Sequence, residues 1–224
     1  MKLQLLLILH AIKNKVENKL RKIRVAEGFT LAEVLITLLI IGIVASIVIP
    51  ALIHDTQDAE LKIAWKKGYA EVSQAMSRVF YDNSYNLVSL NIPASSQYSN
   101  IKDYFNYTKA YSNMSPCCQP LKNVYPGFTT IKRLNGTDES YCLFDDGILI
   151  LNSGIILIFN NVPETTIWVD VNGLKGPGVI GKDVFGIKVY KNMIKPFGSA
   201  GDGYENTCTP TSTGWGCAAR YLTQ

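Results

Sequence analysis

The chain has 224 residues, enough for one globular domain of ordinary size plus a membrane segment and too few for two full domains. Hydrophobic residues make up 47% and charged residues 18%, proportions that exclude an intrinsically disordered chain. The formal net charge of +4 is unevenly distributed. Residues 1–28 hold seven Lys or Arg against two Glu (net +5), and the remainder holds 15 basic and 16 acidic residues (net −1), which argues against a nucleic-acid-binding body.

The segment that follows this basic stretch is apolar over a length typical of a membrane span. No charged residue occurs from Val34 to Ile53, and 16 of these 20 residues are apolar. A helix of about 20 apolar residues crosses the hydrocarbon core of a bilayer. Because Lys and Arg are concentrated before the run, we expect its N-terminal side to stay in the cytoplasm and the rest of the chain to lie outside. The run is longer than the apolar region of a secretory signal, and no small-residue cleavage site follows it.

Helical periodicity continues beyond the apolar run. Apolar residues recur at intervals of three or four, with charged residues on the other faces: Leu61, Trp65, Tyr69, Val72, Met76 and Val79. Pro50 is the single proline in this stretch, and transmembrane helices tolerate one proline with a bend. The pattern predicts one long helix over residues 30–81. Its first half is apolar all round, as expected in lipid or a subunit core, and its amphipathic second half should pack on a domain.

The remainder of the chain predicts an antiparallel sheet. Residues 83–140 are rich in Asn, Ser and Tyr, and we expect a polar connector with a short helix near residues 101–109. Strand patterns then occupy residues 141–151, 155–159, 165–171 and 184–190, the first two joined by a hairpin turn. The Gly-rich stretch from residue 197 is predicted to be loop. The fold class is therefore α+β, with a long N-terminal helix packed on a C-terminal antiparallel sheet.

All five cysteines follow residue 116, and this distribution fits a domain in an oxidising compartment. Cys208 and Cys217 flank eight residues, a spacing suited to a small disulfide loop. Cys142 could pair with Cys117 or with Cys118, which leaves one cysteine over. Adjacent cysteines with no histidine nearby make a poor zinc site. The cysteines therefore predict disulfides and no bound zinc.

Oxygen-bearing side chains bracket a Gly-rich stretch late in the chain. Asp170, Asn172 and Asp183 offer the carboxylate and amide oxygens that suit calcium. The stretch is not an EF-hand, since glycine stands at its fourth position and the twelfth is Gly181 where an EF-hand has Glu. A competing interpretation is a tight turn in which the Asp and Asn side chains bond their own backbone. Calcium is the one cofactor that the sequence suggests.

Histidine usage argues against an enzyme. The chain has two histidines, His10 before the apolar run and His54 at its end. Neither position suits a Ser-His-Asp or Cys-His arrangement in the outer domain. We therefore expect no catalytic residues.

The letters GFTLAE at residues 28–33, running into VLITLLIIGIVASIVIPAL, resemble the N-terminus of type IV pilins and type II secretion pseudopilins. In that family a basic leader ends in Gly, and a membrane prepilin peptidase cuts before the following Phe, whose new amino group is then methylated. Counted from Phe29, Glu33 is the fifth residue and Pro50 the twenty-second, which are the family's positions for Glu and Pro. The resemblance covers about residues 22–55 closely.

The resemblance implies a division into three parts: a prepilin leader over residues 1–28, a transmembrane and assembly helix over 29–54, and an extracytoplasmic α+β domain over 55–224. It implies cleavage between Gly28 and Phe29, with N-methylation of Phe29. The mature chain would be a structural subunit of a type IV pilus or of a type II secretion pseudopilus. Some pseudopilins also bind calcium in a comparable late loop.

The family's partners and location follow as expectations. The chain would begin in the inner membrane, in contact with lipid, and then enter a periplasmic or extracellular filament. Its partners would be its own kind and related pilin subunits, the prepilin peptidase and an inner-membrane assembly platform. An alternative function is a minor pilin that acts as an adhesin or takes up DNA. The feature that favours DNA is a set of late lysines: Lys182, Lys188, Lys191 and Lys195.

Glu33 has a physical reason for its position if the chain is cleaved. Cleavage after Gly28 creates an ammonium on Phe29, and Glu33 of a neighbouring subunit can pair with it when the helices stack with an axial offset. A charge in an apolar environment is costly unless it is paired. Such a pair would set the register between subunits more than it adds net stability. The simpler interpretation is an isolated anchor whose Glu33 lies among lipid headgroups.

Overall fold

A computed structural model describes residues 30–82, 101–112, 131–139, 144, 146–160 and 165–224 of the chain. The chain divides into two compact units, Met1–Leu52 and Ile53–Gln224. The described elements are, in order, α2 (Leu31–Asp82), η2 (Lys102–Tyr104), β1 (Tyr107–Ser112), β2 (Gly147–Leu151), β3 (Ile156–Asn160), β4 (Thr166–Asp170), η5 (Gly173–Lys175), β5 (Val184–Val189), β6 (Ile194–Pro196) and α4 (Cys217–Thr223).

Helix α2 has 52 residues and includes Pro50, which confirms the single long helix expected over residues 30–81. In the first unit its large apolar side chains are exposed, among them Leu31 at 80% and Ile47 at 70%. The stretch Leu31–Pro50 has a mean hydropathy of 2.7 and none of it is buried. By length and composition, this stretch is able to cross a membrane.

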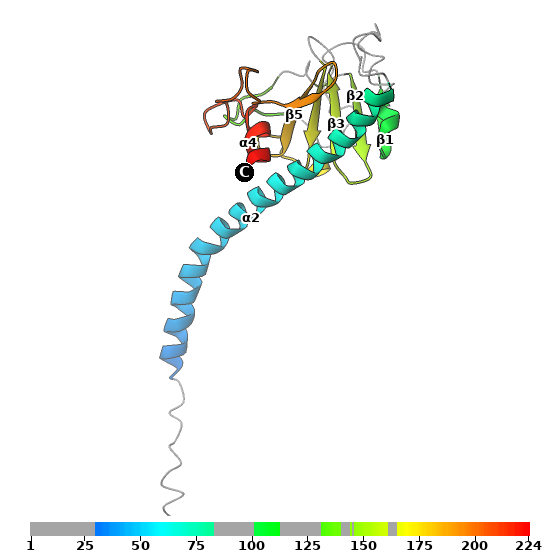
Figure 1. The fold of residues 1–224 in the computed structure, drawn as a ribbon. Helices are drawn as coiled ribbons and strands as arrows, with labels where there is room; N and C mark the ends of the chain where they lie inside the picture. Colours follow the sequence, from blue (N-terminus) through cyan, green and yellow to red (C-terminus); the bar gives the residue numbers. More distant parts are fainter. Residues whose placement is uncertain (1–29, 83–100, 113–130, 140–143, 145, 161–164) are drawn as a thin grey trace, which may run out of the picture. The chain divides into compact units, whose positions relative to one another are not determined.

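In the second unit α2 is amphipathic, as its sequence pattern predicts. Its buried face carries Trp65, Val72, Met76, Val79 and Phe80, at helical spacing. The Trp65 ring stacks on Phe185 of β5 with ring centroids 4.7 Å apart. Its indole N–H donates to the backbone oxygen of Ala218 in α4 at 2.9 Å. This end of α2 therefore lies across the sheet and reaches the C-terminal helix (Figure 1).

The sheet has six antiparallel strands in the order β1-β2-β3-β4-β5-β6, so each strand pairs with its neighbour in sequence. Every residue of β3 and β4 is buried, which means that both faces of the sheet are covered. Helix α2 covers one face. On the other face Trp168 packs against three aromatic rings with centroid distances of 5.2–5.3 Å: Phe144, Phe197 and Trp215.

The α+β class and the predicted hairpin between β2 and β3 are confirmed. The structure differs from the sequence prediction in the bounds or type of several short elements. The described residues Phe144 and Asp146 lie outside β2, which begins at Gly147 and not at residue 141. The helix expected near residues 101–109 is only η2, because residues 107–112 pair with β2 as the edge strand β1. Helix α4 occurs where only loop was expected, and the Trp65 indole N–H bonds to it from far away in sequence. Strand β6, for which no element was predicted, pairs with the adjacent strand β5.

Candidate functional site

The first turn of α2 is closed by a reciprocal pair of hydrogen bonds between Thr30 and Glu33. The Glu33 N–H donates to Thr30 Oγ1 at 3.2 Å. Glu33 Oε2 accepts from both the backbone N–H and the hydroxyl of Thr30, each at 2.8 Å. This is a capping box, in which the Glu33 carboxylate and the Thr30 hydroxyl each satisfy one backbone N–H that has no partner inside the helix. The carboxylate also lies at the positive end of the helix dipole.

This local role of Glu33 was missed at the sequence level, although the signal is present in the letters T-L-A-E at residues 30–33. Gly28 and Phe29, the predicted cleavage site, lie outside the described residues, so cleavage and methylation stay predictions. The structure therefore places Glu33 at the N-terminus of α2, exposed and bonded to Thr30.

A second candidate site lies between β4 and β5. Asp170 is the last residue of β4 and Asp183 directly precedes β5. The strand register pairs Asp170 with Val184, and the Val171 N–H donates to the backbone oxygen of Asp183 at 2.9 Å. Only 1% of Asp170 and 0% of Asp183 is exposed. Strand pairing thus brings together two buried carboxyl groups that are 13 residues apart in sequence.

Backbone N–H groups of the connecting loop point at both carboxyl groups. Asp170 Oδ1 accepts from the N–H groups of Asn172 at 3.1 Å and Gly173 at 2.9 Å. Asp183 accepts from Gly178 at 3.0 Å and from Val179 at 2.5 Å, through its two different oxygens. The Asn172 amide donates to the backbone oxygen of Gly176 across the loop. The turn-like bonding considered as the competing interpretation is therefore present.

Asp170 Oδ2 is the exception. This buried oxygen has no hydrogen-bond partner among the described residues. Burial and, to a smaller extent, the neighbouring charge of Asp183 raise the pKa of Asp170 to about 8, against the hydrogen bonds from Asn172 and Gly173, which lower it. Burial also raises the pKa of Asp183, against the hydrogen bonds that its side chain accepts. Two buried carboxyl groups at close range cannot both be ionised unless a cation or another donor compensates them.

These groups fit a calcium ion in their chemistry, because calcium takes carboxylate, amide and backbone oxygens in a flexible arrangement. Within the part of the chain that the structure describes, no three His, Cys, Asp or Glu side chains converge. Asp170 and Asp183 would therefore supply the charged ligands, and Asn172 and backbone carbonyl groups of the loop would have to supply the others. The orphaned Oδ2 of Asp170 is the oxygen best placed to gain from such an ion.

The disulfide expected between Cys208 and Cys217 is confirmed, with Cα atoms 4.7 Å apart. It closes a loop that ends at the start of α4. Cys117, Cys118 and Cys142 lie outside the described residues, so their pairing stays a prediction.

The four late lysines do not form one patch. Lys182 lies before β5 and pairs with Asp58 of α2 at 3.6 Å. Lys188 and Lys195 face each other across β5 and β6, near Lys191 in the turn. Three lysines thus gather at the β5–β6 hairpin and the fourth belongs to the other end of β5.

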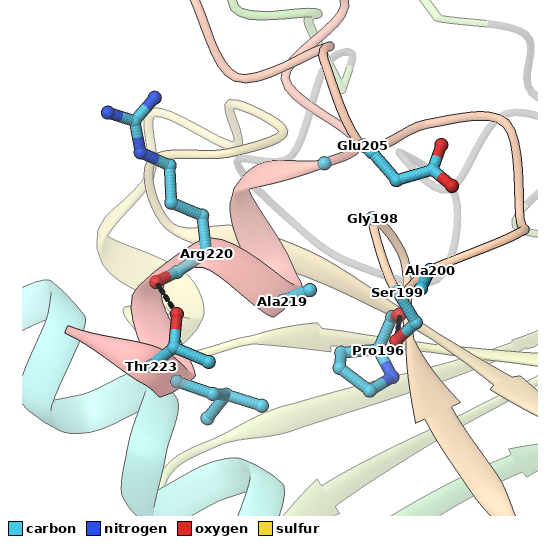
Figure 2. Close-up of a pocket in the computed structure, with 10 residues that line it drawn as sticks. Pro196, Gly198, Ser199, Ala200, Glu205, Ala219, Arg220 and Thr223 are labelled. Carbon is cyan, nitrogen blue, oxygen red and sulfur yellow. Dashed lines mark hydrogen bonds between the residues drawn. The ribbon is translucent and has the colours of Figure 1, made fainter.

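A cleft of about 570 Å³ lies between the residues after β6 and helix α4 (Figure 2). Its lining is mostly small, and two hydroxyl groups in it are already used as donors to backbone oxygens. Ser199 donates to Pro196 at 2.6 Å, and Thr223 donates to Arg220 at 2.9 Å. The lining also contains the carboxylate of Glu205, which accepts from the Gly201 N–H at 2.6 Å.

Comparison with known proteins identifies the N-terminal segment. Residues 23–49 match a family model described as the prokaryotic N-terminal methylation motif, the signature of the prepilin-type segment of type IV pilins and pseudopilins. The matched residues include Gly28, Phe29, the capping box and most of the apolar stretch of α2. The comparisons with curated proteins and with solved structures gave no match.

The buried carboxyl groups predict how stability depends on pH. In a metal chelator, the free energy of unfolding should fall as the pH rises from about 4 to about 8. The reason is that folded Asp170 keeps its proton up to a pKa of about 8, whereas the unfolded chain releases it near 3.8, so the folded state binds more protons in this window. Denaturant unfolding of the full chain in detergent, followed by tryptophan fluorescence across pH, measures the slope.

The Asp170→Asn variant should remove most of this slope, since an amide does not titrate. Asp103→Asn is the matched control, because Asp103 is exposed in η2 and its loss should leave the slope in place. A wild-type stability that stays level between pH 4 and pH 8 would contradict the assignment.

Proposed function

We propose that this chain, whose N-terminal methylation motif marks it as a pilin-like subunit, builds an envelope filament after cleavage between Gly28 and Phe29. The filament would be a type IV pilus or a type II secretion pseudopilus. The observation that carries the proposal is that the motif coincides with the start of a 52-residue helix whose first 20 residues are uncovered and mostly apolar, with Glu33 as their one charged residue. The motif indicates a structural subunit rather than an enzyme.

The uncovered half of α2 supports assembly as well as anchoring. Its large apolar side chains between Leu31 and Ile53 are 43–80% exposed, and water does not favour such a surface. In a bilayer, lipid chains cover it. In a filament, the same side chains of neighbouring subunits would cover one another, and van der Waals packing would replace lipid contacts. One surface thus serves both states.

Glu33 would connect the two states. In the single chain its carboxylate caps α2 through Thr30. In the filament its charge would pair with the new ammonium of Phe29 from a neighbouring subunit. Both bonds to Thr30 use Oε2 of Glu33, so the carboxylate can keep them and accept a further partner at its other oxygen. Because an unpaired charge in an apolar core is costly, only stacks with the correct axial offset would be stable.

The location and partners of the chain follow within the same proposal. The leader at residues 1–28 would stay in the cytoplasm, where the prepilin peptidase removes it at the membrane. The second unit would lie outside the cytoplasm, in keeping with its disulfide. An inner-membrane assembly platform and other pilin-like subunits would then complete the filament.

The alternative function, a minor pilin that binds DNA or a surface, receives weaker support. Lys182 is engaged by Asp58, and the three lysines at the β5–β6 hairpin belong to a mature chain with a net charge of −1. Binding to DNA by such a hairpin would weaken steeply with salt. Gel shifts of the full chain across salt concentrations separate this function from a purely structural one.

A second proposed function is the binding of calcium by the β4–β5 loop. Two observations support it: the paired burial of Asp170 and Asp183, and the partnerless Oδ2 of Asp170 among the described residues. A divalent cation would let both carboxyl groups be ionised inside the fold. Its binding would tie the ends of a loop that spans residues 171–183.

Processing gives the first test of the filament proposal. Mass spectrometry of the protein from membranes or shed filaments should find an N-terminal peptide that begins with methylated Phe29. The Gly28→Leu variant is the control and should keep its leader, since a bulky side chain at the cut bond blocks access of the peptidase. An intact N-terminus in the wild-type protein, or a start at any other residue, contradicts the proposal.

Glu33 offers a sharper test, because its capping bonds and its charge are separable. Glu33→Gln keeps an oxygen that can cap Thr30, whereas Glu33→Ala removes both the cap and the charge. If pairing with Phe29 matters, both variants should insert into the membrane but yield at least tenfold less sheared filament than the wild type. Normal filament yield from Glu33→Gln, together with failure of Glu33→Ala, would assign Glu33 a capping role only.

Calcium binding is tested by melting curves of the full chain in detergent. Calcium at millimolar concentration should raise the melting temperature by several degrees relative to chelator, since a ligand that binds only the folded state stabilises it. The Asp170→Asn and Asp183→Asn variants should lose this rise, and Asp103→Asn should keep it. Identical wild-type melting temperatures in calcium and in chelator would end the proposal.

A further inference from the structure

The backbone that faces Asp183 is held from outside the β4–β5 loop. Gly178 and Val179 donate their N–H groups to the Asp183 carboxyl group. The same stretch bonds to Lys132, whose N–H donates to Gly178 O at 2.9 Å and whose carbonyl oxygen accepts from Ile180 N–H at 2.8 Å. The segment 131–139 thus fixes the position of the donors that orient Asp183.

The disulfide loop, defined here as residues 208–217, packs directly on this stretch. Gly181 has φ +83°, and a Cβ on it would lie 2.6 Å from Gly214 O and 3.0 Å from Cys217 Sγ. Gly214 has φ +85°, and a Cβ there would lie 2.3 Å from Ile180 O. The two backbones therefore meet with no room for a side chain, and the Sγ atom of Cys217 lies close to Gly181, near the end of the β4–β5 loop.

The segment 131–139 also binds the disulfide loop. The Leu134 N–H donates to Thr213 O at 3.1 Å. The Trp215 indole N–H donates to Glu139 Oε2 at 3.1 Å. Glu139 is buried and receives two further bonds from Arg133, at 2.8 Å and 2.7 Å. Each of three stretches that are far apart in sequence therefore contacts the other two: residues 131–139, 178–181 and 213–217.

We infer that the Cys208–Cys217 disulfide loop positions the calcium site, so that the disulfide strengthens calcium binding and calcium protects the disulfide from reduction. This inference rests on the proposed calcium site. Without the disulfide, the loop at residues 208–217 gains freedom and the contact between Gly214 and Gly181 loosens. The N–H groups of Gly178 and Val179 then hold Asp183 less firmly. By linkage, calcium must shift the equilibrium of disulfide reduction by the same factor by which the disulfide changes calcium affinity, and we expect the reduction rate to change in the same direction.

Calcium titration calorimetry of the full-length protein in detergent micelles tests the first effect. The double variant Cys208→Ser, Cys217→Ser should bind calcium on the order of tenfold more weakly than the wild type. Val79→Ala is the control for a general loss of stability, because it removes buried methyl groups from α2 and should leave the calcium Kd unchanged. A double variant with wild-type Kd overturns the coupling.

The reciprocal effect is measurable in the protein with its cysteines intact. Reduction of Cys208–Cys217 by dithiothreitol, followed by alkylation and peptide mass spectrometry, should be several-fold slower in calcium than in chelator. Asp183→Asn should abolish this protection. Equal reduction rates in calcium and chelator overturn the inference, even if the serine variant fails to fold. Absence of calcium binding to the wild-type protein would overturn the calcium site itself, which is a different result from binding without coupling.

Discussion

The rest of the structure depends on one constraint: the first half of α2 carries an apolar surface that its own chain does not cover. From Leu31 to Pro50 nothing is buried, and the side chains there are among the most apolar in the protein. Such a helix is stable only in lipid or against other helices of the same kind. Membrane insertion and the proposed filament assembly would each meet this requirement, and the N-terminal methylation motif, matched over residues 23–49, includes most of this stretch.

The second half of the same helix meets the opposite requirement. Trp65 and the apolar residues that follow at helical spacing are buried on the sheet, and the Trp65 indole N–H reaches α4. Because β3 and β4 are covered on both faces, α2 is part of the core of the second unit rather than a stalk attached to it.

Around the far face of the sheet, the fold is held by loops that stabilise one another. The β4–β5 loop, the segment 131–139 and the disulfide loop contact one another through backbone hydrogen bonds and through glycines that permit close approach. The pairing of β4 with β5 places two buried carboxyl groups, those of Asp170 and Asp183, in this region. Buried polar groups in such loops are normally hydrogen-bonded, and among the described residues of this region Asp170 Oδ2 and Thr213 Oγ1 are the buried side-chain oxygens without a partner.

The sequence alone determined whatever depends on neighbours within a few residues. Periodicity of 3.6 identified α2 to within one residue at each end, alternation identified β3 to β5, and the short cysteine spacing identified the disulfide. Tertiary structure decided the rest. Strand β1 and helix α4 form because of partners that are far away in sequence. Strand β6, of three residues, pairs with the adjacent strand β5 and was too short to be predicted from its own pattern. The burial that raises the pKa of Asp170 likewise comes from segments that no local pattern could bring together.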